Sequence, residues 1–197
     1  KELPLSLDKL IAIGTEEESV VPGVKDATEE LKQFFHDRLR VMQKDQGFTA
    51  HEVESVIGSE PAILADVPKR LKAVHDFMSL PEAESLAAAN KRIENILKKN
   101  TLPLADAVDP ALLTEKEEKD LYEAIRTLEP KLEADYKAGR YEDELRSLAP
   151  LKAPVDAFFD KVMVNAEDEA LRRNRLTLLN ELHKAMNQVA KLSCLAS

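Results

Sequence analysis

Apolar residues recur at the three- and four-residue spacing of a helix through most of this 197-residue chain. The clearest segments are 25–46, 82–99 and 153–182, in each of which leucine, isoleucine, valine or phenylalanine lines one face. No segment keeps the two-residue alternation of a half-buried strand. Gly47 and Gly139 stand where two of the helical patterns stop. The sequence therefore predicts an all-α fold, a bundle of helices joined by short loops.

Capping residues mark where individual helices begin. Thr49 with Glu52, and Thr114 with Glu117, have the spacing of capping boxes. Pro130 then predicts a break or kink in the second of these helices, unless that helix continues to Ala138. The apolar faces also predict a set of buried side chains, namely Phe34, Phe35, Leu86, Ile93, Phe158, Phe159 and Leu178.

The N-terminal segment differs from the rest of the chain. Its apolar start is followed by the acidic run 16–18 and then by Pro22-Gly23, which is typical of a linker. We predict that residues 1–22 are the tail of a preceding helical domain with its linker, and that residues 23–197 form one helical domain. Because the chain begins at Lys1, inside an apolar-periodic segment, we expect it to be part of a longer protein.

Composition narrows the class of protein. The chain is 44% hydrophobic and 33% charged, and no apolar run approaches the roughly 18 residues that a membrane span needs. Cys194 is the only cysteine, so a disulfide framework is excluded and a reducing compartment is favoured. With no signal or transit segment visible, we expect a cytoplasmic protein without a membrane partner.

The net charge of −9 argues at first against a nucleic-acid-binding protein. The charge is unevenly distributed, however. Residues 114–144 contain eleven acidic and six basic side chains, whereas residues 88–100 contain four basic and one acidic. A polyanion responds to a local basic surface more than to the total charge. The sequence therefore allows RNA binding at 88–100, with modest affinity.

A helix over 82–99 would separate its residues into two faces. Leu86, Ile93 and Leu97 fall on the apolar side. The opposite side, about 120° wide at 100° per residue, carries what we call the basic stripe: Lys91, Arg92, Asn95, Lys98 and Lys99. Such a stripe can follow a phosphate backbone and offer an amide to a base edge. Taken alone, these residues fit a solvated helix face better.

Other arginines admit two interpretations. Arg172 and Arg175 are three residues apart and share a helix face. For Arg172 we favour a structural ion pair with Asp168 or Asp156, whereas for Arg175 a structural role and an RNA contact are equally supported. Two further arginines, Arg38 and Arg40, fall on the exposed side of the 25–46 helix.

Motifs that would carry catalysis are missing from the sequence. The four histidines are dispersed, without the spacing of metal ligands. The chain has no glycine-rich phosphate loop and no GxSxG nucleophile motif. We therefore predict no catalytic residue and no metal ligand here.

Two stretches carry a resemblance to a known family. Residues 153–176 contain the pattern PVDAFFDxVMV…AEDEALRxNRL, and residues 88–99 contain AANKRxxNILKK. Both resemble the C-terminal region of the bacterial-type glycyl-tRNA synthetase beta subunit, and weaker similarity, including the DRLR segment at 37–40, extends from about Leu31 to Ala190. That region is an anticodon-binding domain of the helical class named for its Asp-Ala-Leu-Arg motif, which reads Glu169-Ala170-Leu171-Arg172 here.

The resemblance implies a function and partners. It implies that the chain binds tRNA-Gly through the basic stripe, with Arg175, Arg38 and Arg40 as further contacts. It also implies an alpha2beta2 heterotetramer in which the alpha subunit adenylates glycine with ATP, so that this chain needs no cofactor. One departure is Lys191, where the family pattern has an acid. A plant organellar enzyme with fused alpha and beta regions would resemble the same range.

Two other functions remain open. The chain could be a non-catalytic helical scaffold that binds protein through its acidic faces, or the anticodon module of a related synthetase of the arginyl type. The basic stripe distinguishes a scaffold from an RNA-binding module, because a scaffold has no need of four cations on one helix face.

Overall fold

The computed structural model describes residues 6, 9, 12–13 and 28–196. Within these ranges the regular structure is helical, and β-type pairing is limited to one isolated antiparallel bridge between Ser6 and Ile63. The predicted all-α fold is confirmed. The predicted tail and linker, 1–22, lies almost wholly outside the described residues, so the domain boundary at residue 23 stays a prediction.

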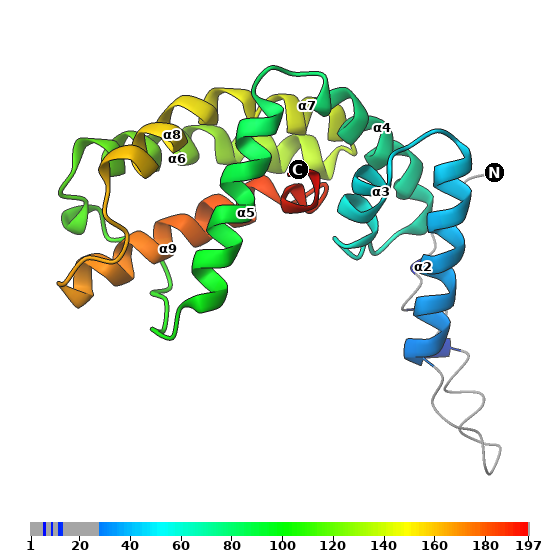
Figure 1. The fold of residues 1–197 in the computed structure, drawn as a ribbon, viewed down its shortest axis with the longest axis horizontal. Helices are drawn as coiled ribbons and strands as arrows, with labels where there is room; N and C mark the ends of the chain where they lie inside the picture. Colours follow the sequence, from blue (N-terminus) through cyan, green and yellow to red (C-terminus); the bar gives the residue numbers. More distant parts are fainter. Residues whose placement is uncertain (1–5, 7–8, 10–11, 14–27, 197) are drawn as a thin grey trace, which may run out of the picture.

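The helices form an elongated bundle (Figure 1). Helices α5, α6, α8 and α9 pack together at one end, α4 packs on α7, and α2 and α3 lie at the other end. The α-helices are α2 (Thr28–Asp45), α3 (Ala50–Ile57), α4 (Val67–Met78), α5 (Ala83–Lys99), α6 (Lys116–Lys137), α7 (Tyr141–Arg146), α8 (Lys152–Lys161) and α9 (Glu169–Met186). Short 3-10 helices are η1 (Leu64–Asp66), η2 (Pro110–Leu112), η3 (Ala149–Leu151) and η4 (Leu192–Leu195).

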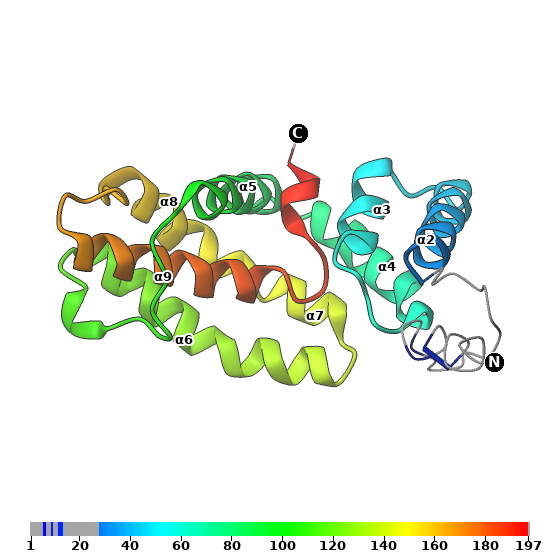
Figure 2. The same ribbon diagram turned by 90° about the horizontal axis from the view of Figure 1, so that it is seen from below.

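The C-terminal turn η4 connects the two ends of the bundle. It packs against both α5 and α3, as Figures 1 and 2 show from two directions. The backbone N–H of Lys191 donates to the carbonyl of Ser55 at 2.7 Å, which ties the tail to α3. Leu192 and Leu195 are buried beside it. The tail is therefore part of the core rather than an appendage.

The helix boundaries test the capping predictions. The box of Thr49 with Glu52 is confirmed at the start of α3. The second box was predicted one residue too early, because Glu115 caps α6 and Glu118 returns to it. Helix α6 also continues through Pro130, which lies on the exposed side, where the carbonyl left without an N–H partner can meet water.

Burial separates the predicted core residues into two groups. Leu86, Ile93, Phe158 and Leu178 are fully buried, as predicted. Phe159 is half-buried. The prediction is wrong for α2, where Phe34 is 63% exposed and Phe35 is 39% exposed. Helix α2 packs mainly on α3, so the described residues leave most of its apolar face uncovered.

One buried ion pair links α6 to α9. Arg175 Nε lies 2.8 Å from Glu118 Oε1, and Arg175 also donates to the Met163 carbonyl at 2.9 Å. Glu118 in turn accepts from the backbone N–H of Glu115 at 2.8 Å. Burial by itself raises the pKa of Glu118, but the Arg175 guanidinium and these donors outweigh it, so the pKa lies below its usual value.

A second acid, Glu144 on α7, is buried without such partners. Its side chain is fully buried, and its carboxylate oxygens accept no hydrogen bond from the residues that the structure describes. Burial raises the pKa of Glu144 to about 8. Arg70 and Lys131 act against this rise, and Asp135 adds to it. The raised pKa of Glu144 therefore favours its protonated form in the folded protein.

We expect Arg175→Met to destabilise the fold by about 3–5 kcal/mol, because it leaves the Glu118 carboxylate buried without its cation. The free energy of unfolding in urea measures this cost. Lys116→Met is the matched control, since Lys116 pairs with Asp120 at an exposed site and such pairs contribute only about 0–1 kcal/mol. Equal midpoints and slopes for the two variants would contradict the assignment.

We also expect the free energy of unfolding of Glu144→Gln to rise with pH relative to that of the unchanged chain. Between about 4.5 and 8 the folded chain keeps a proton on Glu144 that the unfolded chain has released. This group therefore lowers the free energy of unfolding as pH rises through that window, by as much as about 1.4 kcal/mol per pH unit. Urea unfolding at pH 5, 6, 7 and 8 measures the difference. A difference that stays constant with pH would refute the raised pKa.

Candidate nucleic-acid interface

Helix α5 presents the basic stripe as predicted. Leu86 and Ile93 are buried on one side, whereas all five residues of the stripe are exposed on the other. The structure therefore brings Lys91, Arg92, Asn95, Lys98 and Lys99 together on one surface. Figure 2 shows α5 and α6 on opposite sides of the bundle, so the stripe is remote from the acidic helix α6.

Neighbouring elements hold part of the stripe in place. The guanidinium of Arg92 lies over the ring of Phe159 on α8, 4.2 Å from its centroid. Lys91 Nζ donates to the carbonyl of Ala196 at 3.3 Å. Asn95 and Lys99 have no side-chain hydrogen bond or ion pair with any other described residue. The stripe thus combines one stacked cation with side chains that are free to bind a ligand.

An acid on the same helix is shared between two lysines. Glu94 Oε1 lies 2.7 Å from Lys98 Nζ and 3.1 Å from Lys191 Nζ. Burial by itself raises the pKa of Glu94. Hydrogen bonds from Lys98, Ser193 and Lys191 outweigh this effect, so the pKa falls to about 2. Lys191, the residue that departs from the family pattern, therefore ties the C-terminal tail to α5.

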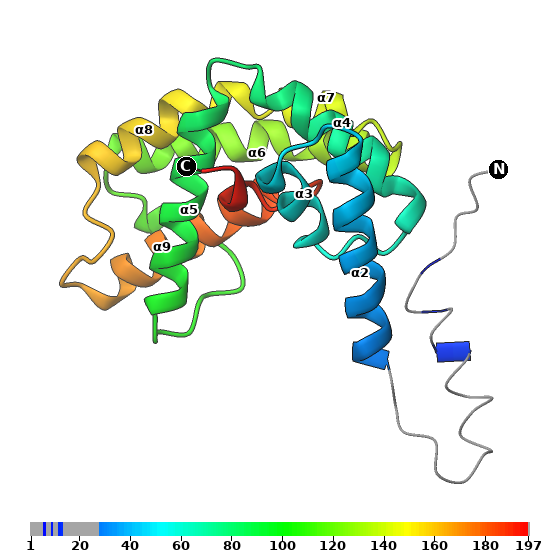
Figure 3. The ribbon, with the colours of Figure 1, turned by 45° about the vertical axis from the view of Figure 1, so that its right-hand side comes forward.

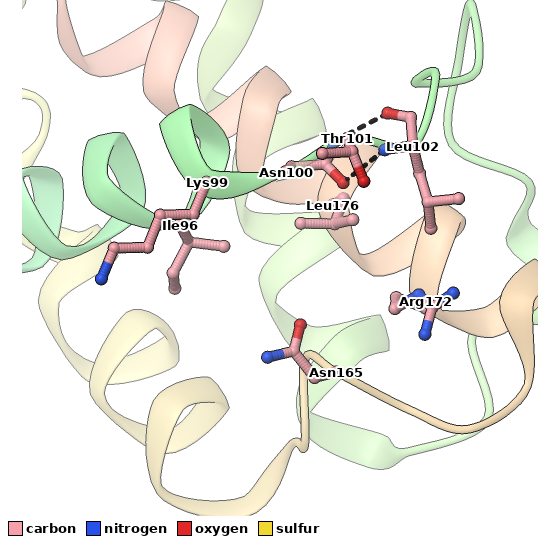
Figure 4. A pocket seen from close by; sticks show the side chains of 8 residues that line it. All are labelled: Ile96, Lys99, Asn100, Thr101, Leu102, Asn165, Arg172 and Leu176. Atoms are coloured by element: carbon pink, nitrogen blue, oxygen red, sulfur yellow. Dashed lines mark hydrogen bonds between the residues drawn. The ribbon is translucent and has the colours of Figure 1, made fainter.

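Two hollows border the stripe. The first, about 350 Å³, is lined by residues of α5 alone: Ala88, Lys91, Arg92, Asn95, Ile96 and Lys99. The second, about 550 Å³, lies where α5 ends near the start of α9 (Figure 4). We call it the α5–α9 cavity, and its lining residues are Ile96, Lys99, Asn100, Thr101, Leu102, Asn165, Arg172 and Leu176. Because both hollows include Ile96 and Lys99, they adjoin.

The structure decides the roles of Arg172 and Arg175 on α9 differently from what we expected for Arg172. Arg175 is only 5% exposed and is held by Glu118, so the structure places it inside the fold rather than on the stripe. Arg172, which we expected to form a structural pair, lines the α5–α9 cavity instead. Neither predicted acid holds it, because Asp168 caps α9 and Asp156 pairs with Lys152.

The sequence pattern does not distinguish these arginines, since both lie on one face of one helix. The residue that decides between them is Glu118, which is 57 positions away from Arg175 in the chain. The sequence-based prediction also missed Asn165, an exposed residue between α8 and α9 that lines the cavity. A single polar residue in a loop belongs to no helical face and no motif, so its sequence position does not indicate a role.

Arg38 and Arg40 lie apart from the stripe. Both belong to α2, and α3 stands between α2 and α5 in the three views (Figures 1, 2 and 3). Arg38 is exposed. Arg40 is engaged by two carboxylates, with Nε 2.6 Å from Glu54 Oε1 and Nη1 2.8 Å from Asp37 Oδ1. Arg38 and Arg40 therefore do not form one continuous surface with the stripe.

The described part of the chain offers neither a metal cluster nor a membrane span. Among the described residues (6, 9, 12–13 and 28–196), the His, Cys, Asp and Glu side chains form no group of three or more that could hold a metal ion. Over the same residues, each helix is too short or too polar to span a bilayer.

Comparison with known proteins gives close relatives over the whole chain. It is 51% identical to the glycine–tRNA ligase beta subunit of Delftia acidovorans, covering 100% of this chain and 28% of that protein. Identity is 53% with the beta subunit of Methylobacillus flagellatus (87% of this chain, 24% of that protein). With that of Dechloromonas aromatica it is 49% (99% and 27%). The chain thus spans about a quarter of the length of these relatives.

A family model matches the part of the chain that holds the site. The model of the DALR anticodon binding domain covers residues 86–193, from α5 to η4. This range includes the basic stripe, the α5–α9 cavity and the Arg175–Glu118 pair. Since the match covers more than half of the 197 residues, this chain belongs to the DALR anticodon binding domain family.

Proposed function

We propose that this chain is the anticodon-binding part of a glycine–tRNA ligase beta subunit, and that its basic stripe contacts the anticodon arm of tRNA-Gly. The observation that carries the proposal is the position of the stripe. Four cations and one amide are exposed together on α5, inside the range of the anticodon binding domain, in a chain whose net charge is −9. An acidic protein that concentrates cations at one site has a local surface for a polyanion.

The chemistry of an RNA loop suits the composition of the stripe. A single-stranded loop presents phosphates beside unstacked bases, so its recognition needs cations for the backbone and directional groups for base edges. Lys91, Lys98 and Lys99 suit the first role. The free amide of Asn95 suits the second, since it can both donate and accept a hydrogen bond. Arg92, supported by Phe159, suits a phosphate contact with little loss of side-chain entropy.

The relatives' names support further proposals about the assembly. They are called beta subunits of a glycine–tRNA ligase, so we propose a separate alpha subunit as partner, in an alpha2beta2 heterotetramer of the cytoplasm. We assign the ATP-dependent adenylation of glycine to that alpha subunit. The absence of catalytic motifs from the sequence of this chain supports this assignment, and we propose that the chain itself needs no cofactor.

The other candidate functions have less support. The names of the relatives specify glycine, which favours a glycyl over an arginyl enzyme. One observation favours an additional contact with protein: α2 leaves Phe34 and Phe35 exposed on its apolar face. Arg38, exposed on the same helix, stays a proposed contact with tRNA outside the stripe, and Arg40 is less available because of its two acids.

We expect the triple variant Lys91→Ala, Lys98→Ala, Lys99→Ala to weaken binding to all tRNAs. A plot of log K against log salt has a negative slope. Each phosphate of a single strand that the protein no longer neutralises makes this slope shallower by about 0.7. The expected change is therefore about 2 for the three lysines. Filter binding by the full-length protein at several salt concentrations measures both affinity and slope.

The matched control is Lys116→Ala, Lys119→Ala, Lys137→Ala on α6, on the opposite side of the bundle (Figure 2). These lysines are also exposed, and the control removes the same charge. It should leave the salt slope unchanged. If the α5 triple variant behaves as the α6 control does, the stripe is a solvated face and the scaffold interpretation gains.

Asn95→Ala should instead reduce selectivity. If its amide contacts a base edge, the variant loses about 1–3 kcal/mol of preference for tRNA-Gly. The salt slope should not change, because no charge is removed. Competition between tRNA-Gly and bulk tRNA, measured with the full-length protein, gives this preference directly. Parallel weakening toward both competitors would show that Asn95 contributes only general affinity.

A further inference from the structure

The α5–α9 cavity has an apolar side and a side whose backbone is fixed by hydrogen bonds. Ile96, Leu102 and Leu176 supply its apolar side chains. The wall after α5 is fixed by Asn100, whose Nδ2 donates to the Leu102 carbonyl at 2.7 Å and whose Oδ1 accepts from the Leu102 N–H at 2.9 Å (Figure 4). Because both ends of that amide are engaged by Leu102, Asn100 fixes the shape of the cavity wall. The volume of about 550 Å³ lies within the roughly 300–1,000 Å³ of small-ligand sites.

Two polar side chains on the far side are available. Arg172 makes a single hydrogen bond, from Nη1 to the carbonyl of Ala166, at the long distance of 3.5 Å. The amide of Asn165 has no hydrogen-bond partner among residues 28–196. Arg173 Nε, by contrast, donates to the Pro103 carbonyl at the shorter distance of 2.8 Å, and Arg175 is held in the core. The guanidinium fork of Arg172 is thus free to bind a planar acceptor.

The two sides of the cavity differ in their charged surroundings. Figure 4 shows the ammonium of Lys99 pointing away from Arg172, so the two cations of the lining lie apart, Lys99 on the α5 side and Arg172 on the α9 side. The exposed acids near the start of α9, Glu167 and Glu169, do not line this cavity, and Glu169 lines a separate hollow beside Arg173. A phosphate is favoured toward Lys99, because that side of the cavity continues into the stripe, and this leaves the Arg172 fork for the edge of a base. What suits the Arg172 side is a neutral, planar group with hydrogen-bond acceptors.

We propose that the α5–α9 cavity receives one unstacked base of the bound RNA loop, and that Arg172 and Asn165 determine which base is accepted. This inference rests on the proposed RNA-binding function. The base would lie against Leu102 and Leu176, its edge toward Arg172 and Asn165, and its phosphate toward Lys99. Adjacent acceptors on one base edge, such as O2 and N3 of cytosine or O6 and N7 of guanine, match the two N–H groups of a guanidinium. The Asn165 amide can accept from an exocyclic amine on the same base.

Arg172→Lys tests the proposal, because it keeps the positive charge and removes the fork. The probes are anticodon stem–loops of tRNA-Gly in which each loop base is replaced in turn by the other bases or by an abasic nucleotide. We expect the full-length protein to prefer one base at one loop position. Arg172→Lys should reduce that preference at least about tenfold, and should leave the salt slope unchanged. Asn165→Ala, at an exposed loop position, should reduce preference at the same position.

Abasic loops provide the decisive comparison. With an abasic nucleotide at the selected position, Arg172→Lys and the unchanged protein should bind equally, because the group that Arg172 contacts is gone. Arg173→Lys is the matched control, being the adjacent residue of the same type on the same helix, and it should keep full base preference. If the unchanged protein selects bases and Arg172→Lys selects them equally well, this inference is wrong and the proposed function stands. If the unchanged protein binds no stem–loop, the proposed function itself fails.

Discussion

The geometry of the candidate site depends on the buried pair of Arg175 and Glu118. The Arg175 guanidinium joins the start of α6, the Met163 carbonyl before α9, and α9 itself. A charge buried in this way is tolerated only with its partner in place, so α9 has one favourable rotation about its axis. Arg172 is one turn earlier on the same helix, and the same rotation directs it to the cavity. A structural arginine thus orients one that is available to a ligand.

The amphipathic pattern sufficed to predict α5, because its apolar and charged residues occupy opposite faces and the helix packs by one face only. It misled for α2, whose equally regular apolar face contains Phe34 and Phe35. Periodicity identifies a face that avoids water, but not the surface that covers it. For α2 that surface is not among the described residues, whereas for α5 it is supplied by α9, α8 and η4.

The roles of individual polar residues were harder to predict than the helices. Glu118 belongs to α6, yet its carboxylate serves both the cap of α6 and the arginine of α9. The capping box falls on Glu115 because Glu118 is three residues after it, at the third position of α6. The burial of Arg175 depends on a contact with that same Glu118, 57 positions away, of which spacing along the chain carries no record.

The shared acid on α5 has a consequence for how a ligand could be exchanged at the stripe. Glu94 is held by Lys98 from its own helix and by Lys191 from the tail. When an incoming anion draws Lys98 outward, Lys191 remains on the carboxylate, so no uncompensated charge is left beside the core. The tail residue is therefore a second counterion, so that Glu94 keeps a cation whether or not Lys98 stays on it.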